Sequence, residues 1–308
     1  MLNVHIRGKL YSDVLKKKST DQISDGEMVD DIFIARARGD SIVLMDSGTG
    51  ALECHSDHWP AGIRGGAVVH VIGRAVYSAG RMRILCDSIE TLEHGTFTLE
   101  GLLKPPRRDP EEMRRELFSA IESVEDEETK ALLNEIFGSS EMERFFVYPG
   151  ALEIHHAWTS GLLQHTLEVL KCALLAGDMN GMSRDLLTAG ALLHDVGKVF
   201  ELDDGIRISR EGALLGHITQ GIIYVSKKCD TLNMSGERRD KILHIIASHY
   251  GKLEYGSPKE PMFPEAFAVY YGDELSAKLS RIMDFVSAQD GTEDFAYSAR
   301  DRRSIFLR

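Results

Sequence analysis

The sequence predicts a multidomain protein in which a small all-β barrel precedes an all-α domain. Short runs of β-branched and apolar residues recur through the first third of the 308 residues, between clusters of Gly, Asp and Ser. A proline-rich break follows near residue 105, and from residue 150 onward apolar residues recur at helical spacing. We therefore expect a barrel domain over 1–95, a linker with acidic helices over 96–150 and a helical domain over 151–308.

The N-terminal third contains five expected strands in succession. They are DIFIARA (31–37), SIVLMD (41–46), ALECH (51–55), AVVHVIGRAV (67–76) and RMRILCDSI (81–89). Five short strands of this length are typical of an OB-like barrel, which commonly binds single-stranded nucleic acid. Arg36 and Arg81 are candidate contacts to the nucleic-acid backbone. A barrel without a ligand, with both arginines on a solvated surface, remains the alternative.

The middle segment starts with a break at Pro105, Pro106 and Pro110, because each proline removes a backbone donor and restricts the residue before it. The runs EEMRRELFSAIESV and EETKALLNEIFG then carry apolar residues at helical spacing. Residues 91–150 hold 7 basic and 14 acidic residues, so much of the net charge of −12 lies here. A nucleic-acid path would therefore be a local basic groove on a flanking domain.

The composition favours a cytoplasmic protein without a membrane span. No apolar run approaches the roughly 20 residues of a spanning helix, and the N-terminus lacks a signal-peptide core. The four cysteines show no CxxC spacing, which predicts reduced, packed thiols. The sequence carries no signature of oligomer state, so a homo-oligomer stays open as a partner.

Several expected helices aim histidine and aspartate side chains inward. His165 shares a helix face with Leu162 and Val169, and Ser183 is a good N-cap for a helix that ends at Gly197. The dipeptide His194-Asp195 falls in the last turn of that helix. The remaining members of the set begin, close or lie within the helices that follow: His217, His249 and Asp273.

This set of imidazoles and carboxylates points to a catalytic metal, because both groups bind Mn, Fe, Co, Ni, Zn or Mg and no thiolate accompanies them. A single histidine on an apolar helix face is more often a packed core residue. The combined spacing, with His165 29 residues before His194 and His217 22 residues after Asp195, is more specific than any one member. The chain is therefore interpreted as a metal-dependent hydrolase.

The pattern H…HD…D resembles that of HD-domain metal-dependent phosphohydrolases. The motifs LEIHHAWTSGLLQHT, RDLLTAGALLHDVGKVFEL, EGALLGHI, SHYGKLEYGSP and YYGDELSAKL, joined to an OB-like barrel, resemble the YhaM-type 3′-5′ exoribonucleases along nearly the whole chain. The resemblance implies a divalent metal of the Mn²⁺ type, with two ions. It also implies hydrolytic removal of nucleotides from the 3′ end of single-stranded RNA or DNA.

Carried over to this sequence, the family pattern assigns one metal to His165, His194, Asp195 and Asp273. It assigns the second metal to His217 and His249, with Asp195 as the bridge. Two positions depart from the pattern: Tyr250 stands where the family usually has histidine, and Gly272 where it usually has alanine.

Three further residues are candidates for substrate binding. Lys198, one turn beyond the ligand pair, is placed to neutralise phosphate charge and makes up the catalytic pair with Asp195. Its alternative is a helix C-terminal lysine that complements the helix dipole. His155 and His156 are candidates for contact with the substrate phosphate or the metal ligands, and simple packing is their alternative.

Two other functional classes stay open beside the exonuclease. An HD phosphohydrolase of a small nucleotide or cyclic dinucleotide would stay active without residues 1–95, because its barrel would be incidental. A nucleic-acid-binding regulator with a vestigial site would bind without metal-linked turnover. The complete ligand set disfavours the regulator.

Overall fold

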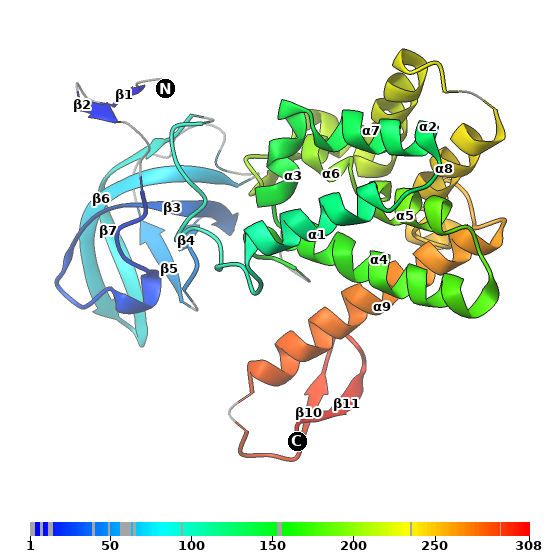
Figure 1. Ribbon diagram of the computed structural model, residues 1–308. Coiled ribbons are helices and arrows are strands. Elements are labelled where there is room, and N and C mark those ends of the chain that lie inside the picture. The colour runs from blue at the N-terminus through cyan, green and yellow to red at the C-terminus, as the bar shows by residue number, and fades with distance from the viewer. Residues whose placement is uncertain are drawn as a thin grey trace. The chain divides into compact units, whose positions relative to one another are not determined.

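The computed structural model describes every residue except 1–3, 7–8, 12–14, 39–40, 49, 56–62, 64–65, 94, 153–155, 235 and 290. By its contacts the chain forms two units, which Figure 1 shows as ribbons. One comprises residues 1–107 with 200–214, and the other residues 108–199 with 215–308. Residues 108–150, which we expected to be part of a linker with helices, therefore belong to the helical unit.

A closed five-stranded barrel forms the first unit and confirms the OB-like prediction. Its strands are β3 (Met28–Arg38), β4 (Ser41–Met45), β5 (Ala51–His55), β6 (Ala67–Ser78) and β7 (Arg81–Thr91), in the order β3-β4-β5-β7-β6. Neighbouring strands are antiparallel except β5 and β7, which run parallel. All five strands coincide with the apolar runs of the sequence.

Strand β3 packs on both of its faces, because successive side chains of a strand point to opposite sides. Phe33 and Ala35 join the core inside the barrel. Ile32 and Ile34 join a second cluster that includes Leu102 and Ile206. Ile206 lies between β8 (Leu202–Asp203) and β9 (Arg207–Ile208), a short hairpin that the sequence did not reveal.

The chain before the barrel includes a hairpin of β1 (Val4–Ile6) and β2 (Lys9–Tyr11) and the short helix η1 (Thr20–Gln22). The segment between β2 and η1 is fastened by Asp31. This carboxylate accepts hydrogen bonds from the backbone N–H groups of Lys17 and Lys18 and from Lys16 Nζ, 3.0 Å away. The Lys16 side chain is only 2% exposed and also lies 3.2 Å from Asp46.

The second unit is helical. Its elements are α1 (Pro110–Glu122), α2 (Glu127–Phe137), η3 (Ser140–Met142), α3 (Glu143–Val147), α4 (Gly161–Asn180), α5 (Arg184–Leu193), α6 (Lys198–Glu201), α7 (Arg210–Thr231), α8 (Glu237–Ser248), η4 (Leu253–Tyr255), α9 (Pro264–Ser287), β10 (Phe295–Ser298) and β11 (Arg303–Phe306), the boundary to the first unit falling within α6 and α7.

Helix α4 lies at the centre of this unit, because its residues are buried on several sides and α5 and α9 both pack against it. Side chains cap α1, α2 and α5 at their N-termini: Asp109, Asp126 and Ser183 each accept a backbone N–H from the first turn. The antiparallel hairpin of β10 and β11 is an addition to the expected all-α domain. None of the helices in the described part of the chain combines the length and hydropathy that a membrane span needs.

Replacing Asp31 by alanine should destabilise the barrel by about 3 kcal/mol, because Lys16 would lose one of two buried carboxylate partners and two backbone donors would lose their acceptor. Urea unfolding of the full chain measures the change. Asp30→Ala is the matched control, since Asp30 is adjacent but 57% exposed and forms ion pairs with Lys17 and His70. Equal losses in the two variants would contradict the role given to Asp31.

Candidate metal centre

Six side chains from five parts of the helical unit converge in two triads. Each member offers one ligand atom, and within a triad these atoms all lie within 4.8 Å of one another. The first triad is His165, His194 and Asp273, and the second is Asp195, His217 and His249. The structure therefore brings together every metal ligand that the sequence predicts.

Asp195 belongs to the second triad but also lies beside the first, and it presents one oxygen to the histidines of each. Its Oδ2 is 3.4 Å from His194 Nε2 and 3.5 Å from His165 Nε2. Its Oδ1 is 3.5 Å from both His217 Nε2 and His249 Nε2. A carboxylate in this position can serve two ions at once, as expected of a bridging ligand.

The backbone at His194 and Asp195 differs from the expectation of a helix that runs to Gly197. Helix α5 ends at Leu193, with His194 as its C-cap. The chain then tightens into turns, in which Val196 N bonds to Leu193 O and Lys198 N to Asp195 O. Hydrogen bonds over three residues wind the chain more tightly than an α-helix and change the direction of Asp195.

Two glycines bring His217 to this turn. A Cβ atom at Gly197 would lie 1.9 Å from the carbonyl oxygen of His217, so only glycine permits the observed approach of the two backbones. Gly216 has a φ of +69°, which interrupts α7 and restarts the helix at His217. This restart matches the predicted start of the helix at His217.

Hydrogen bonds fix the tautomer of three imidazoles. His194 Nδ1 lies 2.8 Å from Ala191 O, and His249 Nδ1 lies 2.8 Å from Ile246 O. Because a carbonyl oxygen only accepts, each Nδ1 must donate its proton, which leaves the Nε2 lone pair for the centre. His165 Nδ1 makes the equivalent contact, 3.0 Å from Ser276 Oγ.

A buried polar chain continues behind His165. Ser276 Oγ donates to Glu168 Oε2 at 2.7 Å, so the hydroxyl is left to accept the proton of His165 Nδ1. Glu168 also accepts from His156 Nε2 at 3.0 Å and from Gln164 Nε2 at 2.9 Å. Burial alone would raise the pKa of Glu168, but the hydrogen bond and charge of His156 outweigh it and lower the pKa to about 2.

Sequence reasoning did not single out Glu168 or Ser276. Each lies three residues after a ligand on the same helix, Glu168 after His165 and Ser276 after Asp273. Residues three apart share a helix face, so this spacing was the available signal.

Burial and the neighbouring carboxylates together set the protonation states of the histidines in the centre. It lowers the pKa of His165 to about 4 and also lowers that of His249, which keeps both rings neutral at pH 7. Burial also acts on His194, yet the charges of Asp195 and Asp273 outweigh it and raise the pKa.

The second triad passes a direct test of fit to a metal ion. Asp195 Oδ1 and His249 Nε2 are buried and lack a hydrogen-bond partner among the described residues. Buried polar atoms without partners are rare and disfavoured, whereas a cation between them would satisfy both. The donor set of imidazole and carboxylate suits a divalent metal.

Lys198 lies at the edge of the centre and is mostly buried. Its ammonium donates to Asp195 Oδ2 and to Gly150 O, both at 2.7 Å. Burial would lower the pKa of this amine, but the charge of Asp195 outweighs it and raises the pKa, so Lys198 stays charged. Two of its three donors are thereby used.

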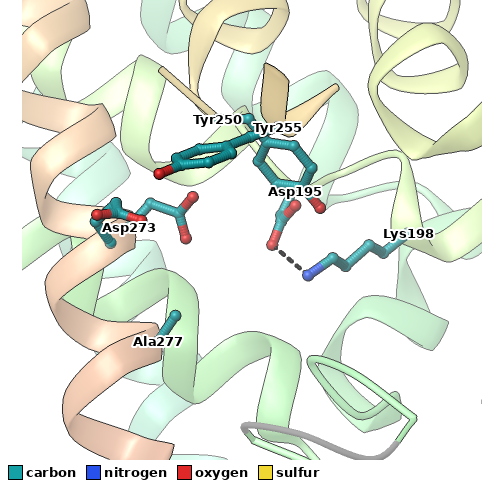
Figure 2. Close-up of a pocket in the computed structure, with 7 residues that line it drawn as sticks. Asp195, Lys198, Tyr250, Tyr255, Asp273 and Ala277 are labelled. Carbon is teal, nitrogen blue, oxygen red and sulfur yellow. Dashed lines mark ion pairs between the residues drawn. The ribbon is translucent and has the colours of Figure 1, made fainter. Parts of the chain in front are cut away.

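A cavity of about 220 Å³ opens onto the centre. Figure 2 shows the side chains that line it, in which the rings of Tyr250 and Tyr255 lie next to each other and close to Asp195 and Asp273. The lining residues are Asp195, Lys198, Tyr250, Tyr255, Asp273, Glu274 and Ala277. Tyr255, Glu274 and Ala277 were not among the sequence candidates, although all three lie in motifs quoted for the resemblance.

The remaining candidates are more dispersed. His155 lies outside the described residues, and His156 is fully buried against Glu168. In the barrel, Arg36 on β3 pairs with Val43 on β4, and Val43 pairs with Glu53 on β5. Glu53 pairs with Arg83 on β7, two residues from Arg81. Three strand spacings and two residues therefore separate the backbones of the two arginines by at most roughly 20 Å.

Comparisons with known proteins agree with this geometry. Residues 162–278 match the model of the HD domain. The 3′-5′ exoribonuclease YhaM of Geobacillus sp. (strain WCH70) is 34% identical over 220 residues, which cover 70% of this chain and 68% of that protein. YhaM of Listeria monocytogenes serotype 4b (strain CLIP80459) is 34% identical over 283 residues, 86% of this chain and 87% of that protein.

YhaM of Bacillus subtilis (strain 168) is 33% identical over 233 residues, which cover 73% of this chain and 74% of that protein. Among solved structures, the HD domain of the L. monocytogenes phosphodiesterase PgpH aligns with 38% of this chain and 66% of that chain. Its sequence identity is 19% and its TM-score 0.29, a likeness too slight to support an argument.

Replacing Ser276 by alanine should weaken binding of a divalent ion about 10- to 100-fold, because His165 loses the partner that orients its ring. Calorimetric titration of metal-free protein with Mn²⁺ as the probe ion measures the affinity. Ser280→Ala is the matched control: it is one turn further along α9, also buried, and its hydroxyl bonds to none of the described residues. The same affinity in both variants would contradict a role for Ser276.

Proposed function

Because the chain belongs to the family of YhaM 3′-5′ exoribonucleases, we propose that it removes nucleotides one at a time from the 3′ end of single-stranded RNA or DNA, using two divalent metal ions. The observation that carries the proposal is the placement of Asp195 between two complete triads, at the floor of a cavity large enough for part of one nucleotide.

The two ions are assigned to the two triads. His165, His194 and Asp273 would hold one, His217 and His249 the other, and Asp195 would contribute one oxygen to each. Mn²⁺ is the proposed metal, because imidazole and carboxylate ligands without thiolate suit it. When bound, such a pair of ions supplies Lewis-acid stabilisation of phosphate charge and makes water more acidic.

Lys198 and Asp195 form the proposed catalytic pair of the protein itself. The charge of Lys198 holds the Asp195 carboxylate ionised at a fixed position, and the third ammonium donor is left for a phosphate oxygen. An ammonium there offsets the negative charge that develops on the phosphate in the transition state. Since Gly150 O and Asp195 already fix the side chain, it needs little reorganisation during the reaction.

The tyrosines of the cavity are proposed to bind the terminal nucleotide. Tyr250 and Tyr255 present ring faces beside the metal triads, and Ala277 leaves space opposite them. Nucleobases stack on aromatic rings with little regard to sequence, as an exonuclease requires. Tyr250 also contacts the rings of His217 and His249, with centroids 5.4 and 4.8 Å away, and so fills the position where the family usually has histidine.

The barrel domain, residues 1–95 in the expected division, is proposed to hold the strand upstream of its 3′ end. Arg36 lies on β3 and Arg81 on β7, three strands away through β4 and β5. In this proposal each arginine binds a different phosphate of an extended nucleic-acid strand. Such local basic contacts are needed because the protein as a whole has a net charge of −12.

A 5′-labelled single-stranded RNA incubated with Mn²⁺ should yield a ladder that shortens from the 3′ end. Asp195→Asn should lower the rate at least about 1000-fold, because both triads lose a charged oxygen and Lys198 loses its partner. Asp178→Asn, an exposed carboxylate on α4, should leave the rate unchanged. An intact oligomer beside rapid hydrolysis of free nucleotides would reassign the chain to the small-molecule phosphohydrolases.

Replacing Tyr255 by alanine should lower kcat/KM about 10- to 100-fold on ordinary RNA, because the terminal base loses its stacking surface. Tyr255→Phe should stay near wild type. With an oligomer whose 3′-terminal nucleotide lacks its base, wild type and Tyr255→Ala should become equal. A persistent difference on this substrate would show that Tyr255 acts otherwise than by stacking.

A further inference from the structure

Helix α9 exposes a continuous apolar ridge to solvent. Its five members recur every fourth residue and are 44% to 62% exposed: Phe267, Tyr271, Leu275, Leu279 and Met283. Side chains four apart lie above one another on a helix, so they form one stripe. The opposite side of α9 packs inward through Val269, Ser276 and Ser280. The stripe is therefore a second apolar surface that the core does not use.

The hairpin after α9 adds exposed aromatic residues. Phe295 and Phe306 are cross-strand partners with ring centroids 5.2 Å apart, and Tyr297 shares their side of β10. All three are 55% to 64% exposed. In Figure 1 the C-terminal half of α9 extends beyond the other helices of its unit, with β10 and β11 beside it. A two-stranded hairpin is marginally stable by itself, so a covering partner would stabilise it.

The apolar area matches what a stable interface needs. From the exposed fractions, the ridge offers roughly 500 Å² and the hairpin roughly 350 Å² more. A standard protein interface buries about 800 Å² on each partner, and exposed apolar patches of this size mark interaction surfaces.

We propose that the α9 ridge, together with the aromatic residues of the hairpin, is the interface of a homodimer in which α9 of one copy packs antiparallel against α9 of a second. The ridge is centred on Leu275 and extends two steps of four residues in each direction, so a two-fold rotation superposes it on itself. Ridges of residues four apart pack into the grooves of a like helix, the commonest mode of helix packing. The ridge is therefore self-complementary, and a second copy of this chain can pack against it.

The charges beside the ridge favour the same partner. Glu274 and Lys278 form an ion pair within α9, with Lys278 Nζ 2.6 Å from Glu274 Oε2. An antiparallel copy reverses their order and places both ion pairs on the same edge of the interface, where each Glu274 lies about 3 Å along the helix axis from the Lys278 of the other copy. A parallel copy would instead place the two ion pairs on opposite edges of the interface. Asp273 lies about 200° around the helix from Leu275 and so points away from the interface. Glu274 lies at the edge of the interface and also lines the cavity.

Sedimentation velocity of the full chain tests the proposal. Wild type should be a dimer at micromolar concentration. The double variant Leu275→Glu, Leu279→Glu should be a monomer, with a dimer Kd raised at least about 100-fold by like charges in the interface. Met179→Glu, which replaces a still more exposed apolar residue on α4, should stay dimeric. Circular dichroism and thermal melting check that each variant is folded.

Charge exchange tests the antiparallel arrangement. Lys278→Glu alone should weaken the dimer, because acidic side chains would then meet across the interface, and adding Glu274→Lys should restore it. A monomeric wild type at 100 µM concentration, on the order of a weak interface's Kd, would overturn the proposal. So would a ridge variant that keeps the wild-type oligomeric state, or a Lys278→Glu variant that dimerises normally.

Discussion

The interaction on which the helical unit depends is the burial of the Asp195 carboxylate among four histidines and Lys198. An ionised carboxylate without partners would be strongly destabilising in the interior. Here Lys198 Nζ lies 2.7 Å from Oδ2, and four imidazole nitrogens lie within 3.5 Å of the two oxygens. Four helices, α4, α5, α7 and α8, therefore meet around this one side chain. Two of the imidazoles that face it lie on α4 and α7, and the other two belong to the residues that directly follow α5 and α8.

The surrounding hydrogen bonds prepare the centre for cations. Ala191 and Ile246 carbonyls fix two imidazoles, and the chain from Glu168 through Ser276 fixes a third. In each of these hydrogen bonds the imidazole donates its Nδ1 proton, so that its Nε2 lone pair points into the centre. The geometry is thus set by backbone and buried side chains rather than by flexible loops, so a metal would meet ligands that need little rearrangement.

Helix α9 serves two surfaces at once. Its inner side carries Asp273 and Ser276, which belong to the metal centre and to the polar chain behind it. Its outer side carries the apolar ridge around Leu275. Both follow from the same helical period, since residues two positions apart point in nearly opposite directions. Dimerisation through the ridge would stabilise the helix that carries Asp273, a candidate metal ligand.

The sequence by itself predicted the five barrel strands, the helical character of the second domain and the six candidate metal ligands. Alternation and turn residues located all five barrel strands, and residue type with helical spacing identified His165, His194, Asp195, His217, His249 and Asp273. Both signals are local, because they depend on one strand or helix. Tertiary structure alone decided the end of α5 at Leu193, the contact of Glu168 with Ser276 across 108 residues and the placement of Arg36 and Arg81 three strands apart around the barrel. These features arise from packing between segments far apart in the chain, where a close backbone approach such as Gly197 to His217 overrides local helical preference.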